Sequence, residues 1–498
     1  MENTIRSVSG LDYAVIGAFF VLMICIGVYF GRKTKSMAQY FSAGKKIPWW
    51  LSGASFYMLS FSAMAFVMHS ELAYKYGIVS FVLSWMAVPA AIFSGLLFAR
   101  RWRRIASTSP LEYIEERYGV GMRQGLMWLG LPTRLLDNSI RLFAIGTVVS
   151  MGLGFSFQQT VIVCTIIILT YSCMGGLLVS IVGDFVQLIL LLLAVLPLPF
   201  LALKRAGGVE ATLQALPPDF WSWTRPEADY IAVYLICYFG VLFLNYSTNW
   251  ALAQRYYSTK DDKGAIKIGL LVAALYLIGT PLFYTPGLVA HTFMPGLENT
   301  KEVYPLLCRT LLPAGMLGML VAALFAATMS TLAGEYNAVS SVVTNDFYKR
   351  FIRKDASEKH LLLVGRLGAV LTGLVILGMT LGMRAILLGP DLFKSMAIVF
   401  TIFLPPVAIP MLLGMLTPRV SAFGGKLGLS LGVVLGVTTF IAGICFPGWG
   451  LHKLWVLLPL TCGSTLLAML VGSLAKPDQG ERRERVIQFF KKANGEPV

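Results

Sequence analysis

Two short polar stretches could together bind a monovalent cation. Residues 58–62 (MLSFS) and 327–331 (ATMST) each place hydroxyl and backbone oxygens inside a long apolar run. On a helix, Ala327, Ser330 and Thr331 share one face because they stand at i, i+3 and i+4. A carbonyl freed near Ala327 and the two hydroxyls would then supply three oxygen ligands.

The first stretch would complete this ligand set if its helix is broken. Unwound backbone at membrane depth is tolerated only where it lines a cavity or meets an ion. Sodium is a hard cation that is bound by such oxygens, and no carboxylate is needed where several dipoles converge. We therefore predict a sodium site formed by the carbonyls of Met58, Phe61 and Ala327 and the hydroxyls of Ser330 and Thr331.

A second polar group lies on the helix predicted over 125–152. Arg134, Asp137, Asn138 and Arg141 occupy one face at i, i+3, i+4 and i+7. Placing a guanidinium in a membrane span costs about 2.5–3.5 kcal/mol, and Asp137 can neutralise only one of the two arginines. The remaining charge suits a substrate carboxylate, because the planar guanidinium matches two oxygens. The alternative is an Arg-Asp-Arg network that only braces this helix.

Polar residues of two interrupted helices would line the rest of a substrate pocket. The substrate candidates are Ser60, Ser62, Arg134, Asn138, Arg141, Asn245 and Thr248. Two acids at membrane depth, Asp184 and Glu335, are candidates for holding a second cation or a proton. The alternative for both acids is a salt bridge near the cytoplasmic vestibule.

The composition indicates an all-α integral membrane protein. Of the 498 residues, 56% are hydrophobic and 13% charged, and the mean hydropathy is +0.71. Apolar runs long enough to cross about 30 Å of hydrocarbon predict about thirteen spans, near 11–31, 48–68, 78–99, 125–152, 157–173, 178–203, 229–251, 266–290, 314–344, 361–383, 393–416, 424–446 and 453–474.

The basic residues predict how these spans are oriented. Most of the 41 Lys and Arg residues fall on one side if the N-terminus lies outside and the C-terminus in the cytoplasm. The formal charge of +16 is then a topogenic signal, and it favours contact with anionic lipid of the bilayer over nucleic acid. We expect a multi-pass protein of the cell membrane with no nucleic-acid partner and no evident obligate protein partner.

Ten of the spans form two sets of five, which must run in opposite directions because five is odd. An inverted repeat of this kind places a site at the membrane midplane, where helices of both halves are interrupted. The predicted organisation is an N-terminal helix and loop over 1–46, a first five-helix repeat over 47–204, an outer loop over 205–228, an inverted repeat over 229–417, two C-terminal helices over 418–475 and a cytoplasmic tail over 476–498.

Several landmarks, in this order and spacing, cover nearly the whole chain: residues 40–44 (YFSAG), 48–50 (PWW), 110–119 (PLEYIEERYG), 254–255 (QR), 329–332 (MSTL) and 345–350 (NDFYKR). They resemble the sodium:solute symporter family, which includes sodium-coupled sugar, proline, pantothenate and sialic acid transporters. The resemblance implies a leucine-transporter-type fold and sodium-driven uptake. It also places the shared sodium site on the five residues predicted above.

Departures from the family pattern narrow the expectations. Some relatives have a second sodium site with an aspartate, which Asp184 matches, but the lower hydroxyl positions here are Ala333 and Gly334. One sodium per cycle is therefore expected. Positions that hold sugar in the sugar branch are mostly apolar here, and the acidic residue of the proline branch is replaced by Ser60. In the sialic acid branch an arginine of the equivalent helix meets substrate.

We therefore predict a sodium-coupled symporter, with Na+ as the coupling ion, that imports a small organic solute bearing a carboxylate. Two alternatives stay open, namely proton coupling through Glu335 or Asp184 and a sodium/sugar symporter with a non-standard sugar site. A passive channel or sensor on the same fold is a third. An enzyme is not expected, because the sequence has no nucleophile-base arrangement and its four histidines are scattered singly.

Overall fold

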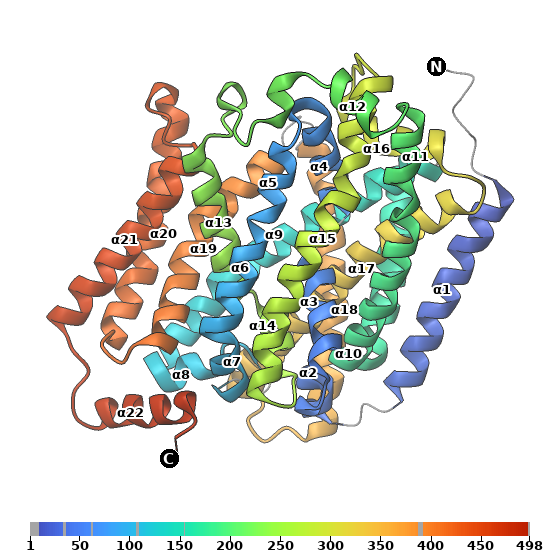
Figure 1. Cartoon of the computed structure of the whole chain (residues 1–498). Coiled ribbons are helices and arrows are strands. Elements are labelled where there is room, and N and C mark those ends of the chain that lie inside the picture. The colour runs from blue at the N-terminus through green and yellow to red at the C-terminus, as the bar shows by residue number, and fades with distance from the viewer. Residues whose placement is uncertain are drawn as a thin grey trace.

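The computed structural model describes residues 9–32, 36–60, 63–105, 109–153, 155–386 and 392–496. These residues are helical almost throughout, and their only β-pairings are two isolated bridges (Figure 1). The helices are α1 (Gly10–Gly31), α2 (Met37–Ser42), α3 (Trp49–Ser60), α4 (Ala63–Tyr76), α5 (Val79–Trp85), α6 (Ala87–Ser94), α7 (Arg100–Ile105), α8 (Glu112–Tyr118), α9 (Val120–Leu153), α10 (Phe157–Val195), α11 (Pro197–Arg205), α12 (Val209–Ala215), α13 (Ala232–Thr248), α14 (Trp250–Tyr257), α15 (Asp262–Phe293), α16 (Val303–Leu311), α17 (Met316–Val342), α18 (Glu358–Ile386), α19 (Leu392–Leu416), α20 (Ala422–Cys445), α21 (Leu454–Ala475) and α22 (Glu481–Asn494).

Most of these helices suit a membrane. Eight helical segments of the described chain are long and apolar enough to cross a bilayer, and the bent pair α3 and α4 would make a ninth. Three further apolar helices are shorter, and α9 is long but carries the arginines expected to face a site. An all-α membrane architecture is thus confirmed, whereas the number thirteen stays a prediction.

The helix expected to break near residues 58–62 does so. α3 ends at Ser60, α4 begins at Ala63, and the two axes differ by 63°. The Ser60 hydroxyl donates to the carbonyls of Phe56 and Tyr57, both at 2.9 Å, and so caps the end of α3. Phe61 and Ser62, two of the predicted site residues, lie outside the described residues.

The corresponding helix of the second half is broken as well. α13 ends at Thr248, and Asn249 leaves helical geometry with φ −59° and ψ 130°. The Asn249 side chain then accepts a hydrogen bond from the Leu252 N–H at 3.0 Å and starts α14. Because an N-cap satisfies the free N–H groups of a new helix, the polar run before Trp250 can interrupt the span at membrane depth.

α10 contains a reversal of the chain. Gly176 has φ 59° and ψ −143°, a region that only glycine adopts readily, and a Cβ there would lie 2.4 Å from the Tyr40 carbonyl. Tyr171 donates to the Val179 carbonyl at 2.6 Å across this turn. The chain therefore turns at Gly176, between the predicted spans 157–173 and 178–203.

The centre of the bundle is α17, whose residues from Ala322 to Val342 are buried without exception. It packs against α1, α3, α9, α10 and α18. A helix that is buried all round cannot face lipid. Polar residues on α17 must consequently find partners within the protein.

The two ends of the molecule carry different covers (Figure 1). At one end the segment after α11 packs over the junction of α4 and α5, where the Ile78 N–H donates to the Phe220 carbonyl at 2.9 Å. At the other end α22 lies against α7 and α8, with Phe489 stacked on Tyr113 at 6.0 Å. α1 begins toward the first of these ends, so its start and the helix α22 lie at opposite ends of the molecule (Figure 1).

Candidate functional site

Thr331 joins α17 to the broken end of α3. Its hydroxyl oxygen lies 3.0 Å from the Ala327 carbonyl, 3.3 Å from the Leu59 carbonyl and 3.5 Å from the Met58 carbonyl. Thr331 and Met58 are buried. One hydroxyl proton cannot serve three carbonyl oxygens at once, so acceptors outnumber donors at this point.

A neighbouring hydroxyl adds to this excess. Ser330 is completely buried, and its hydroxyl interacts with the Asp184 carboxylate. This hydroxyl has no other hydrogen-bond partner among the described residues, so its lone pairs receive no donor. The geometry therefore fits the chemistry of a sodium ion, which needs only oxygen ligands.

Asp184 itself belongs to a buried ionic network. Its Oδ2 accepts from Arg255 Nη2 at 3.1 Å and from the Ser55 hydroxyl, and both charged side chains are fully buried. Arg255 also donates to Ser55 at 2.8 Å and to Ser180 at 2.8 Å. This network ties α3, α10 and α14 together next to the cation-site oxygens.

Gly334 makes room for that network. A Cβ at this position would lie 2.5 Å from the Leu59 Cδ2 and 3.3 Å from the Arg255 Nη2. A second sodium site would need a hydroxyl near this position. The space is instead filled by the Leu59 side chain and the Arg255 guanidinium. Ala333 beside it offers no side-chain oxygen.

Glu335, the other candidate acid, also has a cationic partner. Arg134 Nη1 lies 3.1 Å from both carboxylate oxygens of Glu335, and Asn249 Nδ2 donates to one of them at 2.9 Å. The Arg134 guanidinium also lies over the Trp250 ring, 4.6 Å from its centroid. The start of α14 therefore meets α9 and α17 at one polar point.

The other predicted site residues of α9 make contacts within that helix. Arg141 Nε lies 3.2 Å from Asp137, and the Asn138 amide donates to the Arg134 carbonyl at 2.8 Å. Asp137 thus pairs with one arginine only, as predicted, but the expectation that the other arginine keeps an uncompensated charge is wrong. Glu335, which comes from a distant part of the sequence, supplies the second carboxylate. Asn138 Oδ1 is buried without a donor among the described residues.

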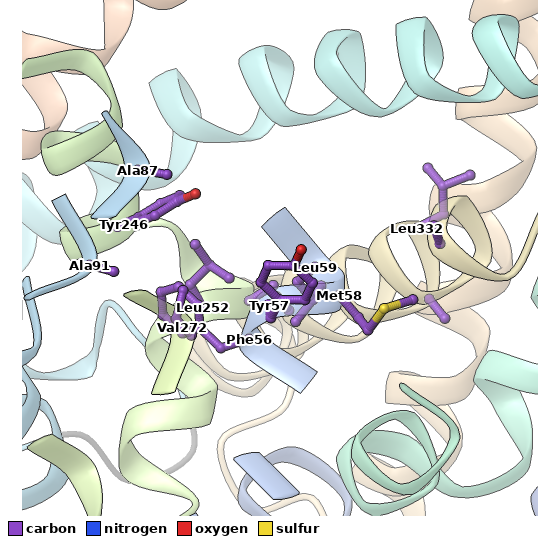
Figure 2. Packing of buried hydrophobic residues seen from close by; sticks show 14 of the residues in the cluster. Phe56, Tyr57, Met58, Leu59, Ala87, Ala91, Tyr246, Leu252, Val272 and Leu332 are labelled. Atoms are coloured by element: carbon purple, nitrogen blue, oxygen red, sulfur yellow. The ribbon is translucent and has the colours of Figure 1, made fainter. Parts of the chain in front are cut away.

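Aromatic side chains pack beside the broken end of α3, and Figure 2 labels Phe56, Tyr57 and Tyr246 among them. Phe56 meets Tyr246 edge-on at 5.5 Å, and Tyr57 meets Tyr276 at 4.9 Å. Tyr246 donates to the Tyr276 hydroxyl at 3.0 Å, which in turn donates to the Ser60 carbonyl at 3.3 Å. Tyr276 thus satisfies one carbonyl that the break sets free.

The other predicted substrate residues lie on α13. Thr248 is buried and its hydroxyl donates to the Leu244 carbonyl at 2.7 Å, within its own helix. Asn245 is partly buried one turn before Asn249. Sequence reasoning missed the Leu59 carbonyl, Tyr276 and Arg255 as neighbours of the site. The one available signal for Arg255 was its position in the sequence just after the predicted break.

A family model described as sodium:solute symporter family matches residues 40–432. The chain belongs to this family. Its members are transporters, so the protein is a sodium-coupled solute symporter and not an enzyme, and Na+ is the coupling ion.

Individual relatives carry different solutes. The chain is 27% identical to a sodium/mannose cotransporter of Bos taurus, with 89% of this chain and 81% of that protein covered. It is 26% identical to the sodium/sialic acid symporter SiaT of Proteus mirabilis, with 73% and 76% covered. The relatives agree on sodium and differ on solute.

Solved structures support the fold. A sodium-coupled sialic acid symporter in a substrate-bound outward-open state matches with a TM-score of 0.83 at 20% identity, over 94% of this chain and 98% of that chain. A nucleobase-cation-symport-1 family transporter matches with a TM-score of 0.60 at 12% identity, over 92% and 99%. The fold of this protein is therefore the leucine-transporter type, as the resemblance implied.

Proposed function

We propose that this symporter imports a small carboxylate-bearing solute by alternating access, with one sodium held between α3 and α17. The carbonyls of Met58, Phe61 and Ala327 and the hydroxyls of Ser330 and Thr331 would bind the ion, and the Leu59 carbonyl would stand beside them. The observation that carries the proposal is the meeting of several carbonyl oxygens with the Thr331 hydroxyl.

Sodium would couple to solute through the broken helix. An ion at Thr331 fixes the end of α3, and the same end carries Ser60 and the aromatic residues around it. A solute that packs against these groups binds better when their position is already set. Each ligand then raises the affinity of the other by the same factor, because coupling free energy is reciprocal.

A stoichiometry of one sodium per cycle rests on the surroundings of Asp184. Arg255 already neutralises this carboxylate in full burial, and Gly334 and Ala333 offer no hydroxyl. A second cation would have to share Asp184 with a guanidinium at 3.1 Å, and like charges disfavour that arrangement. Proton coupling through Asp184 or Glu335 is less favoured on the same ground, since both acids have arginine partners.

The carboxylate of the solute would be met at α9. The side chains of Arg134 and Arg141 are each 16% exposed. A substrate carboxylate could replace Glu335 or Asp137 as the partner of one of these arginines, because it carries the same negative charge. Asn138, Asn245 and Thr248 would add hydrogen-bonding groups. Relatives that carry sialic acid, which is a carboxylate, support this class of solute.

A neutral sugar is the second candidate, because other relatives are cotransporters for mannose and glucose. The two candidates differ in the charge moved. One sodium with a monoanion carries no net charge, whereas one sodium with a sugar carries one, worth about 2.3 kcal/mol per 100 mV.

For the orientation in the membrane, we propose that α1 begins outside and that α22 lies in the cytoplasm, as the basic residues predict.

The test is counterflow in proteoliposomes with panels of organic acids, sugars and amino acids, each with and without sodium. We expect sodium-dependent exchange of an acid, with an initial rate that an imposed membrane potential leaves unchanged. Sodium-dependent exchange of a sugar alone, accelerated by an inside-negative potential, would overturn the carboxylate. If Arg134→Gln and Arg141→Gln both spared transport of an acid, the role of α9 would also be wrong.

A further inference from the structure

An apolar cavity of about 530 Å³ lies between α1, α10 and α17. Its wall is formed chiefly by Ile16, Phe20, Cys164, Ile167, Ala322 and Phe325. A volume in this range is that of a binding site for a small molecule and greatly exceeds what packing faults leave in a protein interior. The cavity is separate from the cation and substrate residues described above.

The cavity is built by fixed contacts and does not arise from a loosely placed helix. At its upper end Asp12 of α1 accepts hydrogen bonds from the N–H groups of Gly315 at 2.8 Å and Gly318 at 2.9 Å, at the start of α17. At its lower end Phe20 meets Phe325 edge-on at 4.9 Å. α1 is thus held to α17 at two points, and the cavity lies between them.

The shape follows from the helical spacing of the lining residues. On α1 they run from Tyr13 to Phe20, and on α10 from Gln159 to Ile167, which corresponds to roughly 10–12 Å at 1.5 Å per residue. The hydrocarbon of one leaflet is about 15 Å deep. The cavity is therefore a slot that follows most of one leaflet, along the direction in which acyl chains lie.

The slot opens toward the bilayer. Val163 and Phe155, which line it, are 53% and 55% exposed on the outer surface of the bundle. Tyr13 and Gln159 stand where α1 and α10 begin, at the level at which a lipid head group and amphipathic side chains meet. A dry apolar space in contact with hydrocarbon fills with hydrocarbon, because an empty one forfeits the dispersion contacts of its walls.

We infer that this slot is a binding site for one acyl chain of a membrane phospholipid, with its head group beside Tyr13 and Gln159. A soluble ligand does not fit, because the opening faces the membrane and the walls are apolar. The acyl chain would pack against the segment of α17 that directly precedes Ala327 and so stabilise it. It would therefore act as a structural ligand of the helix on which the cation-site hydroxyls stand.

Native mass spectrometry of the full chain tests the inference. The protein is saturated with dioleoyl phosphatidylglycerol in detergent and then stripped of lipid in steps. The wild type should keep one phospholipid after the others are lost. Ala322→Phe places a ring in the slot and should lower the retained fraction about tenfold. Ile166→Phe makes the same kind of change on α10 at a position that is 58% exposed and outside the slot, and should retain lipid as the wild type does.

Two further measurements keep the test decisive. If Ala322→Phe does not fold, Val163→Trp blocks the slot from its open side and should give the same loss. Cryo-electron microscopy in nanodiscs of a phospholipid with brominated chains should show chain density between α1, α10 and α17. Equal retention in the slot variants and Ile166→Phe, no retained phospholipid in the wild type, or a slot without density would overturn the inference.

Discussion

The Thr331 hydroxyl lies 3.3 Å from the carbonyl oxygen of Leu59, a residue 272 positions earlier in the chain. This contact joins the late part of the second half to the broken helix of the first. Carbonyl dipoles that converge on one hydroxyl repel each other unless a cation lies among them. The relation between these two residues is therefore the physical basis of the proposed sodium coupling.

Gly334→Ala should weaken sodium dependence. The new Cβ would lie 2.5 Å from the Leu59 Cδ2 and 3.3 Å from the Arg255 Nη2, so both side chains must move, and the packing of the end of α3 against α17 changes beside Thr331. We expect the sodium concentration for half-maximal uptake to rise about tenfold, which corresponds to about 1.4 kcal/mol. Gly378→Ala in α18 is the control, because nothing lies within 4 Å of its Cβ. Equal sodium dependence of both variants would contradict the prediction.

Arg134→Gln should destabilise the protein by about 3 kcal/mol, because it leaves the Glu335 carboxylate buried without its cationic partner. Adding Glu335→Gln should restore most of this loss, since no charge then stays uncompensated. Thermal unfolding in detergent measures both steps. If the double variant were as unstable as the sum of the two single variants, the pair would not interact as the geometry indicates.

The stability of the folded protein should decrease at acidic pH because Glu115 of α8 loses its charge and its ion pairs. A hydrogen bond from Arg350 lowers the pKa of this carboxyl below its usual value of 4.5, burial opposes this effect, and a hydrogen bond from Arg123 adds to the lowering. A lowered pKa in the folded protein contributes stability above the unfolded value, and this contribution is lost as the pH falls through the folded value.

The check is thermal unfolding between neutral pH and about pH 3, with Glu115→Gln as the comparison. We expect the wild type to lose its advantage over this variant as the pH drops below 4.5. Parallel curves for the two proteins over the whole range would show that Glu115 does not contribute in this way.

Phe489→Ala should release α22 from the bundle. Phe489 is 3% exposed and stacks on Tyr113, and truncation of a buried phenylalanine costs about 3–5 kcal/mol. Limited proteolysis should then cut the C-terminal segment faster. Ile487→Ala on the exposed face of the same helix, where the side chain is 47% exposed, should leave the cleavage rate unchanged. Equal rates in the two variants would mean that α22 is held by other contacts.

The local sequence pattern predicted much of the fold and part of the site. Hydropathy predicted the membrane helices, and the spacing of Ala327, Ser330 and Thr331 predicted a shared face, because both depend on neighbours along the chain. The polar run before Trp250 likewise predicted a break, since its residues can cap a new helix.

Pairing between distant helices was beyond such reasoning. Glu335 lies 201 residues from Arg134, and nothing in the spacing of either helix indicates that they meet. Asp184 and Arg255 are a second example. The sequence left a bound cation or proton and a salt bridge as alternatives for Asp184 and Glu335, and both acids make salt bridges in the structure. Charge balance inside a membrane has to be satisfied by the whole bundle, so a residue without a partner on its own helix often has one elsewhere.

Binding of radioactive sodium to the purified protein tests the central claim most directly. The wild type and Thr331→Ser, which keeps the hydroxyl, should bind sodium saturably with similar affinity. Thr331→Ala should bind it about tenfold to a hundredfold more weakly, because an oxygen contact to a charge is worth about 1.5–3 kcal/mol. Sodium binding by Thr331→Ala with the affinity of the wild type would contradict the account.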